Sequence, residues 1–475
     1  MEQPRSASVL AQYPQPDTAR LSAALAAEAN ANQRKIIVLD DDPTGVQTVH
    51  DIFVYTDWSI ESLRKGFAAP EKLFFILTNS RGFTVAETTK AHIEIAEHVD
   101  QVAREFGMDY LIISRGDSTL RGHYPLETDL LRQVAEKKGG FAMDGEILCP
   151  YFKEGGRFTL DNVHYVRYGD ELVPCGQTEF AKDETFGYTS SNLCDYIEEK
   201  TAGKFRAGDV TCISLESLRA LDFDGIEAQL LAVHDFGKVV VNAVEDCDVQ
   251  AFAVALYRAM AKGRHFTIRC AAALVKAIGN ISSQPLLSRE QMVTLKSSAG
   301  GIIVVGSHTK KTTAQLEELK NVPGIEFIEM DSDKVLIPGA LEQEAASIIE
   351  RCAQLIQQGT TCCVSTKRTV LTLPDDTPEA ALVRSVAISD ALQSCVGKLP
   401  VTPAFVVAKG GITSSDVGVK ALRVQCARVL GQIRPGIPVW QTGPESLFPG
   451  TPYVIFPGNV GEVSTLREAV EILLG

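Results

Sequence analysis

Residues 35–45 read KIIVLDDDPTG, an unbroken apolar run that leads into three adjacent aspartates and a turn. A strand without polar alternation is typical of the buried centre of a parallel sheet. In open α/β sheets, ligands bind beyond the carboxyl ends of such strands. Three like charges placed there repel one another, and a bound cation or a substrate hydroxyl would offset that cost. An Asp-rich turn is the alternative interpretation, since Asp, Pro, Thr and Gly are all turn residues.

The composition is that of a soluble enzyme, with 475 residues, 45% of them hydrophobic and 22% charged. A chain of this length exceeds the size of one hydrophobic core and predicts two or more domains. The formal net charge of −14 disfavours nucleic acid or an anionic membrane as a partner. Eleven cysteines without paired metal-ligand spacing indicate reduced thiols and no zinc site. With no signal peptide or membrane span in the sequence, we expect a cytoplasmic protein.

Apolar strand-like runs alternate with helical patterns along the chain, which is typical of α/β architecture. We expect an N-terminal extension over 1–32, a first domain over 33–285, a linker over 286–299 and a second domain over 300–475. The segment Phe152–Glu184 breaks the rhythm with polar, aromatic and glycine residues, and predicts a binding flap. The predicted strands cover residues 35–40, 73–78, 109–114, 146–149, 210–214 and 238–242 in the first half, then 301–305, 325–329, 361–365, 404–408 and 452–456.

Two further polar turns follow predicted strands of the first half, TNSRG at 78–82 and SRGDSTLRG at 114–122. Arginine binds a carboxylate through two parallel hydrogen bonds, and Asp and Ser bind hydroxyls. This mixture favours a small polyhydroxy carboxylate as the ligand, although an exposed, salt-bridged turn is the alternative. The candidate side chains are Arg81, Arg115, Asp117, Ser118 and Arg121.

The second half carries three glycine-centred turns directly after apolar strands: VGSHT at 305–309, AKGGITS at 408–414 and FPGNVG at 456–461. Glycine lets a ligand approach the backbone, and the following helix N-terminus offers amide donors to phosphate. Three such turns in one domain indicate a nucleotide site, although each alone is an ordinary turn of an α/β protein. Neither a P-loop nor a dinucleotide fingerprint is present.

The order of these motifs resembles the four-carbon acid sugar kinases. The matching elements are DDPTG at 41–45, TNSR at 78–81, DSTLRG at 117–122, Gly156-Arg157, the set Gly306, Ser307, Thr312 and Gln315, then GGIT at 410–413 and PGNVG at 457–461. The resemblance implies a two-domain α/β fold, each domain a mostly parallel sheet flanked by helices, with the active site in the interdomain cleft. The first domain would bind the sugar acid and the second would bind ATP.

Carried over by motif, the resemblance implies a sugar-acid pocket and a nucleotide site. The pocket would contain Asp41, Asp42, Arg81, Asp117, Ser118 and Arg121. ATP would contact Ser307, Gly410, Gly411, Ile412, Thr413, Gly458, Val460 and Gly461. The chain departs from the common family pattern at Pro43, at RCAAA over 269–273 and at the last glycine turn. The resemblance implies a four-carbon acid of the erythronate, threonate or 3-oxo-tetronate type as the substrate.

Phosphoryl transfer from ATP with Mg²⁺ to a substrate hydroxyl fits this arrangement, because the protein then mainly positions groups and neutralises charge. We expect Asp42, or else Asp41, to orient or deprotonate the hydroxyl. Arg115 or Arg121 would hold the substrate carboxylate. The sequence identifies no metal ligand, and a homodimer is a further expectation.

Two other functions use the same residues. Asp40 and Asp42 also fit DxDxT, the first motif of haloacid-dehalogenase-like phosphatases, with Asp40 as a phosphorylated nucleophile and Mg²⁺ as cofactor. That interpretation leaves the glycine turns of the second half unexplained. A non-catalytic sensor of sugar acid or nucleotide, built on the same scaffold, is the third hypothesis.

Overall fold

The computed structural model describes residues 2–294, 297–374, 376–458 and 460–475. The chain divides into two compact units. Unit 1 comprises Met1–Gly45 and Asp57–Ser283, and unit 2 comprises Val46–Thr56 and Gln284–Gly475. Residues 46–56, which the sequence placed in the first domain, thus belong to unit 2, and residues 2–32 belong to unit 1 rather than standing apart. Residues 295 and 296 of the predicted linker lie outside the described residues.

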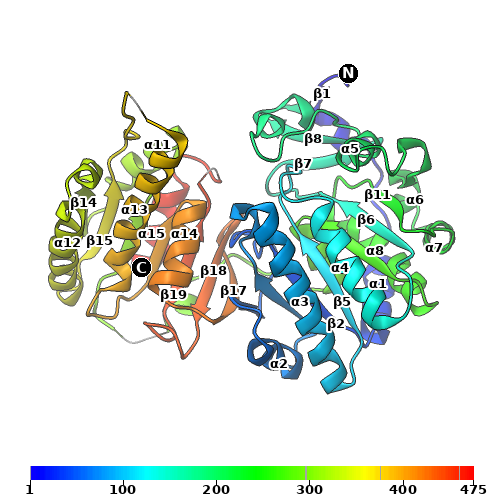
Figure 1. Ribbon diagram of the computed structural model, residues 1–475, viewed down its shortest axis with the longest axis horizontal. Helices are drawn as coiled ribbons and strands as arrows, with labels where there is room; N and C mark the ends of the chain where they lie inside the picture. The colour runs from blue at the N-terminus through cyan, green and yellow to red at the C-terminus, as the bar shows by residue number, and fades with distance from the viewer. Residues whose placement is uncertain (1, 295–296, 375, 459) are drawn as a thin grey trace. The chain divides into compact units, whose positions relative to one another are not determined.

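A parallel sheet forms the centre of unit 1 (Figure 1). Strand β2 lies between β4 and β5, with Asp40 in register with Leu77 and Arg115. All six residues of β2 are buried, as its apolar run predicts. The strand order is β10 (Thr211–Ile213), β11 (Gly237–Val241), β6 (Gly145–Cys149), β12 (Phe266–Cys270), β5 (Tyr110–Arg115), β2 (Lys35–Asp40) and β4 (Leu73–Leu77).

Helices cover both faces of this sheet (Figure 1). The longest, α3, begins with a capping box between Thr84 and Glu87 and ends at Gly107, whose φ of 61° closes the last turn. One group of packed helices is α2 (Ile60–Ala68), α3 (Val85–Phe106) and α4 (Leu126–Gly139), and the other is α1 (Thr18–Ala31), α6 (Leu215–Arg219), α7 (Phe223–Leu231), α8 (Asp246–Ala261) and α9 (Ala272–Ile278).

The predicted flap forms most of a small antiparallel sheet in unit 1, whose fourth strand comes from the N-terminus. Its order is β1 (Arg5–Ser6), β9 (Glu171–Pro174), β8 (Val163–Tyr168) and β7 (Arg157–Leu160), and α5 (Leu193–Lys200) follows it in the chain. Pairing of Arg5 with Leu172 ties the N-terminus to this sheet.

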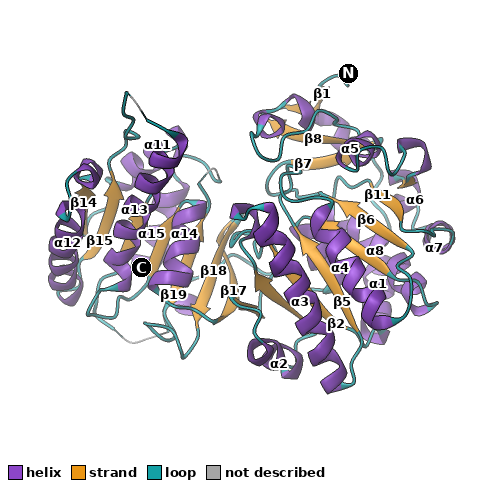
Figure 2. Cartoon of the chain, in the orientation of Figure 1, coloured by secondary structure: helices purple, strands orange, loops and turns teal. Residues whose placement is uncertain are grey.

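Unit 2 has a second sheet with helices packed against it (Figure 2). Five strands are parallel, in the order β14 (Ile325–Met330), β15 (Thr361–Thr366), β13 (Ile302–Val305), β16 (Val406–Lys409) and β19 (Pro452–Phe456). Strands β18 (Ile437–Thr442), β17 (Cys426–Arg434) and β3 (Ile52–Tyr55) extend it antiparallel. The helices are α10 (Arg289–Met292), α11 (Lys310–Leu319), α12 (Ala340–Gln357), α13 (Pro378–Gly397), α14 (Gly411–Asp416) and α15 (Thr465–Leu474).

Short helical turns complete the structure. They are η1 (Ala7–Gln12), η2 (Ser80–Gly82), η3 (Cys175–Gln177), η4 (Glu179–Lys182), η5 (Ala207–Asp209), η6 (Ser332–Leu336) and the π-turn η7 (Val417–Ala421). The predicted class, two α/β domains with mostly parallel sheets and flanking helices, is confirmed. Within the described residues, no helix has the length and apolar character needed to cross a membrane.

Candidate functional site

The aspartate triplet at the end of β2 is bound by two arginines from the neighbouring strand ends. Arg81 donates to Asp41 Oδ1 at 2.7 Å and to Oδ2 at 3.3 Å, and it also donates to Asp42 Oδ2 at 3.3 Å. Arg115 Nη1 donates to Asp40 Oδ1 at 3.0 Å and to Asp41 Oδ1 at 3.4 Å. Parallel pairing of β2 with β4 and β5 therefore brings together residues that lie some tens of positions apart in the sequence.

Asp40 is the most deeply enclosed member of the triplet. Its side chain is 2% exposed, and a Cβ placed on Gly45 would lie 2.0 Å from Asp40 Oδ2. Burial, against the opposing charge of Arg115, raises the pKa of Asp40 to about 7, and the carboxylates of Asp41 and Asp42 add to the rise. A carboxylate covered by backbone in this way has no open side for a phosphorylated substrate. The geometry disfavours the phosphatase mechanism, which requires Asp40 as the nucleophile.

Asp42 has the most open carboxylate of the triplet. Its side chain is 18% exposed. Burial alone would raise the pKa of Asp42, but the charge of Arg81 and hydrogen bonds from Thr44 lower it below its ordinary value. Thr44 donates to Asp42 Oδ1 from its amide at 2.8 Å and from its hydroxyl at 2.5 Å. This carboxylate is better suited to orienting a substrate hydroxyl than to acting as a strong base.

The SRGDSTLRG turn presents a second charged pair in unit 1. Arg121 Nε donates to Asp117 Oδ2 at 2.7 Å, and the Thr119 hydroxyl donates to the same oxygen. Burial opposes ionisation of Asp117, but Arg81 and Arg121 outweigh it and hold the pKa of Asp117 well below its usual range. Ser118 is 7% exposed, and its hydroxyl makes no hydrogen bond to any described residue. Arg81 and Arg121 are partly exposed, whereas Arg115 is buried.

Sequence reasoning missed a buried ion pair beneath this turn. Arg269, on β12, donates to Glu127 Oε2 at 2.6 Å, to Ser114 Oγ at 3.1 Å and to the carbonyl of Arg121 at 3.2 Å. Glu127 also accepts from the Ser80 hydroxyl at 3.3 Å. The only signal in the sequence was the departure RCAAA at 269–273. Arg269 joins the ends of β12 and β5 to the first turn of α4.

In unit 2, the three glycine turns follow the adjacent parallel strands β13, β16 and β19, and their backbones meet closely. A Cβ on Gly410 would lie 3.2 Å from Ser307 Cβ, and a Cβ on Gly458 would lie 3.2 Å from Ser307 Oγ. The Thr312 hydroxyl lies 2.9 Å from Ser307 Oγ and 3.0 Å from the carbonyl of Gly458. Backbone and hydroxyl groups gathered next to a helix N-terminus, here that of α11, suit phosphate oxygens.

A cavity of about 680 Å³ adjoins the first two of these turns, within the range of small-molecule sites. Ser307, Gly410, Gly411, Ile412 and Thr413 line it, together with residues of 366–392. Apolar side chains such as Leu382 and Leu392 share this lining with polar ones.

The last glycine turn contributes differently from the first two. Val460 accepts a hydrogen bond from Gln315 at its carbonyl at 3.2 Å, and its side chain packs against the core of unit 2. Gly461 has φ of 82°, and a Cβ there would lie 2.8 Å from Thr465. Gly458, as described above, contacts Ser307 and Thr312. Asn459, within the predicted PGNVG motif, lies outside the described residues.

Lys409, in the second glycine turn, binds the third turn through its side chain. Its side chain is fully buried, and Nζ donates to the carbonyl of Pro457 at 2.5 Å and lies 4.1 Å from the centre of the Phe456 ring. Burial lowers the pKa of Lys409 to about 7. The side chain thus points into the protein and supports the Gly458 turn rather than projecting toward the cavity.

The described part of the chain contains no group of three or more His, Cys, Asp and Glu side chains arranged to hold a metal ion. The hydroxyls of Ser307 and Thr309 are accessible near Gly458, whereas Thr312 is fully buried and its hydroxyl bonds to Ser307 and to the carbonyl of Gly458.

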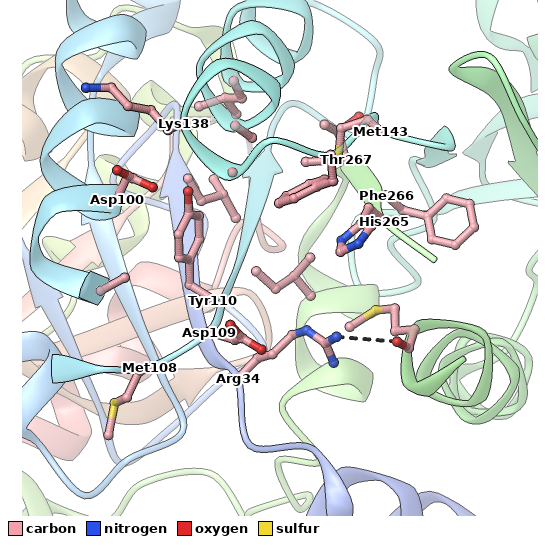
Figure 3. Close-up of a pocket in the computed structure, with 18 of the residues that line it drawn as sticks. Arg34, Asp100, Met108, Asp109, Tyr110, Lys138, Met143, His265, Phe266 and Thr267 are labelled. Atoms are coloured by element: carbon pink, nitrogen blue, oxygen red, sulfur yellow. Dashed lines mark hydrogen bonds between the residues drawn. The ribbon is translucent and has the colours of Figure 1, made fainter. Parts of the chain in front are cut away.

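A second cavity, also about 680 Å³, lies at the N-terminal ends of strands β5 and β12 in unit 1 (Figure 3). Arg34, Tyr110, His265 and Phe266 line it, and Arg34 donates to the carbonyl of Met260 at 3.3 Å. None of the residues predicted from the motifs lines this cavity. Ligands of parallel sheets bind at the carboxyl ends of the strands. The candidate residues of unit 1 follow the carboxyl ends of β2, β4 and β5, at the opposite end of the strands from this cavity.

Comparison with known proteins gives two family matches that together span most of the chain. Residues 36–278 match the sugar-binding N-terminal domain family, and residues 302–466 match the nucleotide-binding C-terminal domain family. A D-threonate kinase of Salmonella typhimurium is 23% identical over 369 residues, which cover 76% of this chain and 80% of the relative.

Two solved structures share the fold. Haemophilus influenzae protein HI1011 has a TM-score of 0.61 at 17% identity, with 92% of this chain and 100% of that chain covered. A Salmonella typhimurium LT2 chain provisionally named a tRNA synthase has a TM-score of 0.66 at 15% identity, with 91% and 98% covered. Likeness at this level of identity concerns the fold alone. The two family matches and the D-threonate kinase relative show that the chain belongs to the four-carbon acid sugar kinase family and is a phosphotransferase.

Proposed function

We propose that this protein transfers a phosphoryl group from ATP to a hydroxyl of a four-carbon sugar acid of the threonate, erythronate or 3-oxo-tetronate type. The observation that carries the proposal is the clamp of Arg81 on Asp41 and Asp42 at the end of β2. It fixes an ionised carboxylate, Asp42, beside partly exposed guanidinium and hydroxyl groups that match an acid with several hydroxyls. The D-threonate kinase relative supports this substrate class.

In this mechanism Asp42 accepts a hydrogen bond from the acceptor hydroxyl and orients it for attack. Its lowered pKa keeps the carboxylate ionised at neutral pH. Arg81 prevents Asp42 from turning away, because it binds Asp41 and Asp42 at once. Asp117 and Ser118 would bind the remaining hydroxyls of the acid, consistent with the free hydroxyl of Ser118.

The glycine turns of unit 2 would hold the nucleotide. Gly410 and Gly458 leave room beside Ser307 that any side chain would fill, and α11 begins nearby at Lys310. ATP supplies the phosphoryl group, and Mg²⁺ bound to its phosphate oxygens would neutralise charge there. The hydroxyls of Ser307 and Thr309 would lie next to those oxygens.

The test is an ATP-consumption assay of the purified chain with D- and L-threonate, D- and L-erythronate and 3-oxo-tetronate, with and without Mg²⁺. We expect turnover with at least one acid and none without nucleotide. Asp42→Asn should lower kcat by about 100-fold or more, in the range of a lost catalytic carboxylate. Arg64→Gln, at an exposed ion pair with Glu105, is the matched control and should leave kcat unchanged.

Two results would contradict the proposal. Phosphate release from a sugar phosphate without ATP would favour a phosphatase, which the enclosure of Asp40 disfavours. Thermal stabilisation by a sugar acid without turnover under any condition would favour a sensor.

A further inference from the structure

Arg157, the first residue of β7, carries a guanidinium group without a carboxylate partner. Its Nε is buried and makes no hydrogen bond, and none of its nitrogens forms an ion pair with a described residue. The guanidinium lies 5.4 Å from the centre of the Phe180 ring, and the guanidinium of Arg121 lies 5.2 Å from the same ring. The two cations therefore share one aromatic contact on the flap.

The other arginines around the site are all neutralised. Within the described structure, Arg81, Arg115, Arg121 and Arg269 each contact a carboxylate, at 2.7, 3.0, 2.7 and 2.6 Å respectively. Arg157 is half-buried, with Nε as its buried and unpaired nitrogen. An anionic ligand can complete a guanidinium group that has no carboxylate partner of its own. Burial lowers the pKa of Arg157, partly opposed by Asp117 and Tyr168, and the nearby Arg121 adds to the lowering.

The flap places Arg157 beside the SRGDSTLRG turn. Arg157 pairs with Val166 on β8, and His164 of the same strand binds the carbonyl of Ser118 through Nε2 at 2.8 Å. Tyr188 further ties the segment after the flap to this turn, since its hydroxyl donates to the carbonyl of Thr119 at 2.7 Å. The unpaired guanidinium and the free Ser118 hydroxyl thus belong to one connected part of unit 1.

We propose that Arg157 binds the carboxylate of the acid substrate and thereby selects acids over neutral polyols. This inference rests on the proposed function and adds a residue that determines specificity. A guanidinium group matches a carboxylate through two parallel hydrogen bonds. Arg115, the alternative from the sequence, is 5% exposed and already holds Asp40. The carboxylate therefore lies under the flap, leaving the hydroxyls to face Asp42.

The experiment measures binding of each acid to the full chain by calorimetry without nucleotide, then KM and kcat with ATP. Arg157→Gln should weaken binding of the acid by about 10- to 100-fold, as expected for loss of a charged hydrogen-bonded contact. It should raise KM for the acid similarly and leave KM for ATP unchanged. Arg157→Lys keeps the charge but cannot form two parallel hydrogen bonds, so its affinity for the acid should lie between those of the wild type and Arg157→Gln.

The matched control is Arg167→Gln, an exposed arginine on the adjacent strand β8 that contacts the carbonyl of Gly169. It should bind the acid as the wild type does. Threitol, a four-carbon polyol without a carboxylate, is the comparison ligand: it should bind weakly, and equally to the wild type and to Arg157→Gln. If Arg157→Gln fails to fold, Arg157→Met keeps the stem that packs near Phe180 and serves in its place.

The outcomes separate the two proposals. If the wild type binds no four-carbon acid, the proposed function fails, and with it this inference. If the wild type binds an acid and Arg157→Gln binds it equally well, the inference alone is overturned. If Arg157→Gln weakened binding of the acid and of threitol equally, the side chain would act through packing, and the inference would be overturned. If Arg157→Gln raised KM for ATP and left KM for the acid unchanged, the side chain would act on the nucleotide, and the inference would be overturned as well.

Discussion

The guanidinium of Arg269 occupies the space into which a side chain at Gly116 would project. A Cβ on Gly116 would lie 2.0 Å from Arg269 Cζ, and one on Gly122 would lie 2.6 Å from Arg269 Nη2. The two glycines of the SRGDSTLRG turn are thus needed for the buried arginine as well as for the turn itself. Through this contact, β12 determines the shape of a turn that carries Asp117, Ser118 and Arg121.

Gly116→Ala should displace Arg269 from Glu127 and destabilise the protein by about 1–3 kcal/mol, as overpacking does. Turnover with the acid should fall as well, because the turn shifts. Urea denaturation and the acid-dependent ATPase rate check these expectations. Gly208→Ala, where a Cβ would meet nothing within 4 Å, is the control. Equal effects of the two substitutions would contradict the role given to Arg269.

Arg269→Met should cost about 3–5 kcal/mol of the free energy of unfolding, because it leaves Glu127 buried without its cation. Arg64→Met breaks an ion pair whose partners are exposed and should cost less than about 1 kcal/mol. The double substitution of Arg269→Met with Glu127→Gln should recover part of the loss, since no unpaired charge remains. A double variant as unstable as the sum of the singles would show that the pair itself contributes little.

Gly410→Ala should weaken ATP binding by about tenfold or more and leave acid binding in unit 1 unchanged. Gly410 has φ of 124°, which side-chain-bearing residues rarely adopt, and a Cβ would lie 3.3 Å from the amide nitrogen of Ser307. Gly324→Ala carries backbone strain too, with φ of 79°, but its Cβ would meet nothing within 4 Å. Calorimetric titration of both variants with ATP distinguishes closure of the nucleotide site from general strain.

His164 should make the protein less stable as pH falls from 6.5 toward 4. Burial lowers the pKa of His164 to about 4 from its ordinary 6.5, although its hydrogen bond to Ser118 opposes the shift. The neutral ring donates from Nε2 to the carbonyl of Ser118 and accepts at Nδ1 from Thr159. The unfolded chain therefore binds the proton more tightly than the folded one. The contribution of His164 to stability is complete above pH 6.5 and is lost as the pH falls from 6.5 to 4.

The loss attributable to His164 is on the order of 3 kcal/mol. It is checked by urea denaturation of the wild type and of His164→Gln at several pH values between 4 and 7.5. The variant should show a shallower decline than the wild type over that interval. Parallel curves for the two proteins would exclude His164 as the titrating group.

Local patterns in the sequence were sufficient for most strands of the parallel sheets. The buried run of β2, the capping box that begins α3 and the glycine turns after β13, β16 and β19 can each be recognised from a few adjacent residues. These elements, with the motif order, predicted the α/β class and the kinase family. Strand β12 was missed because Thr267 and Arg269 interrupt its apolar run, and both residues are buried.

Only the tertiary structure could show which side chains meet. Strand β3 pairs with β17 although some 370 residues separate them, so sequence proximity wrongly suggested that it belongs with the first domain. Asp40 and Asp42 look alike in the sequence. In the structure the backbone at Gly45 encloses Asp40, whereas Thr44 and Arg81 favour the ionised form of Asp42. The lack of an ion-pair partner for Arg157 among the described residues likewise depends on which distant segments surround it. Composition and periodicity report the local chain, whereas burial and charge pairing depend on contacts between distant segments.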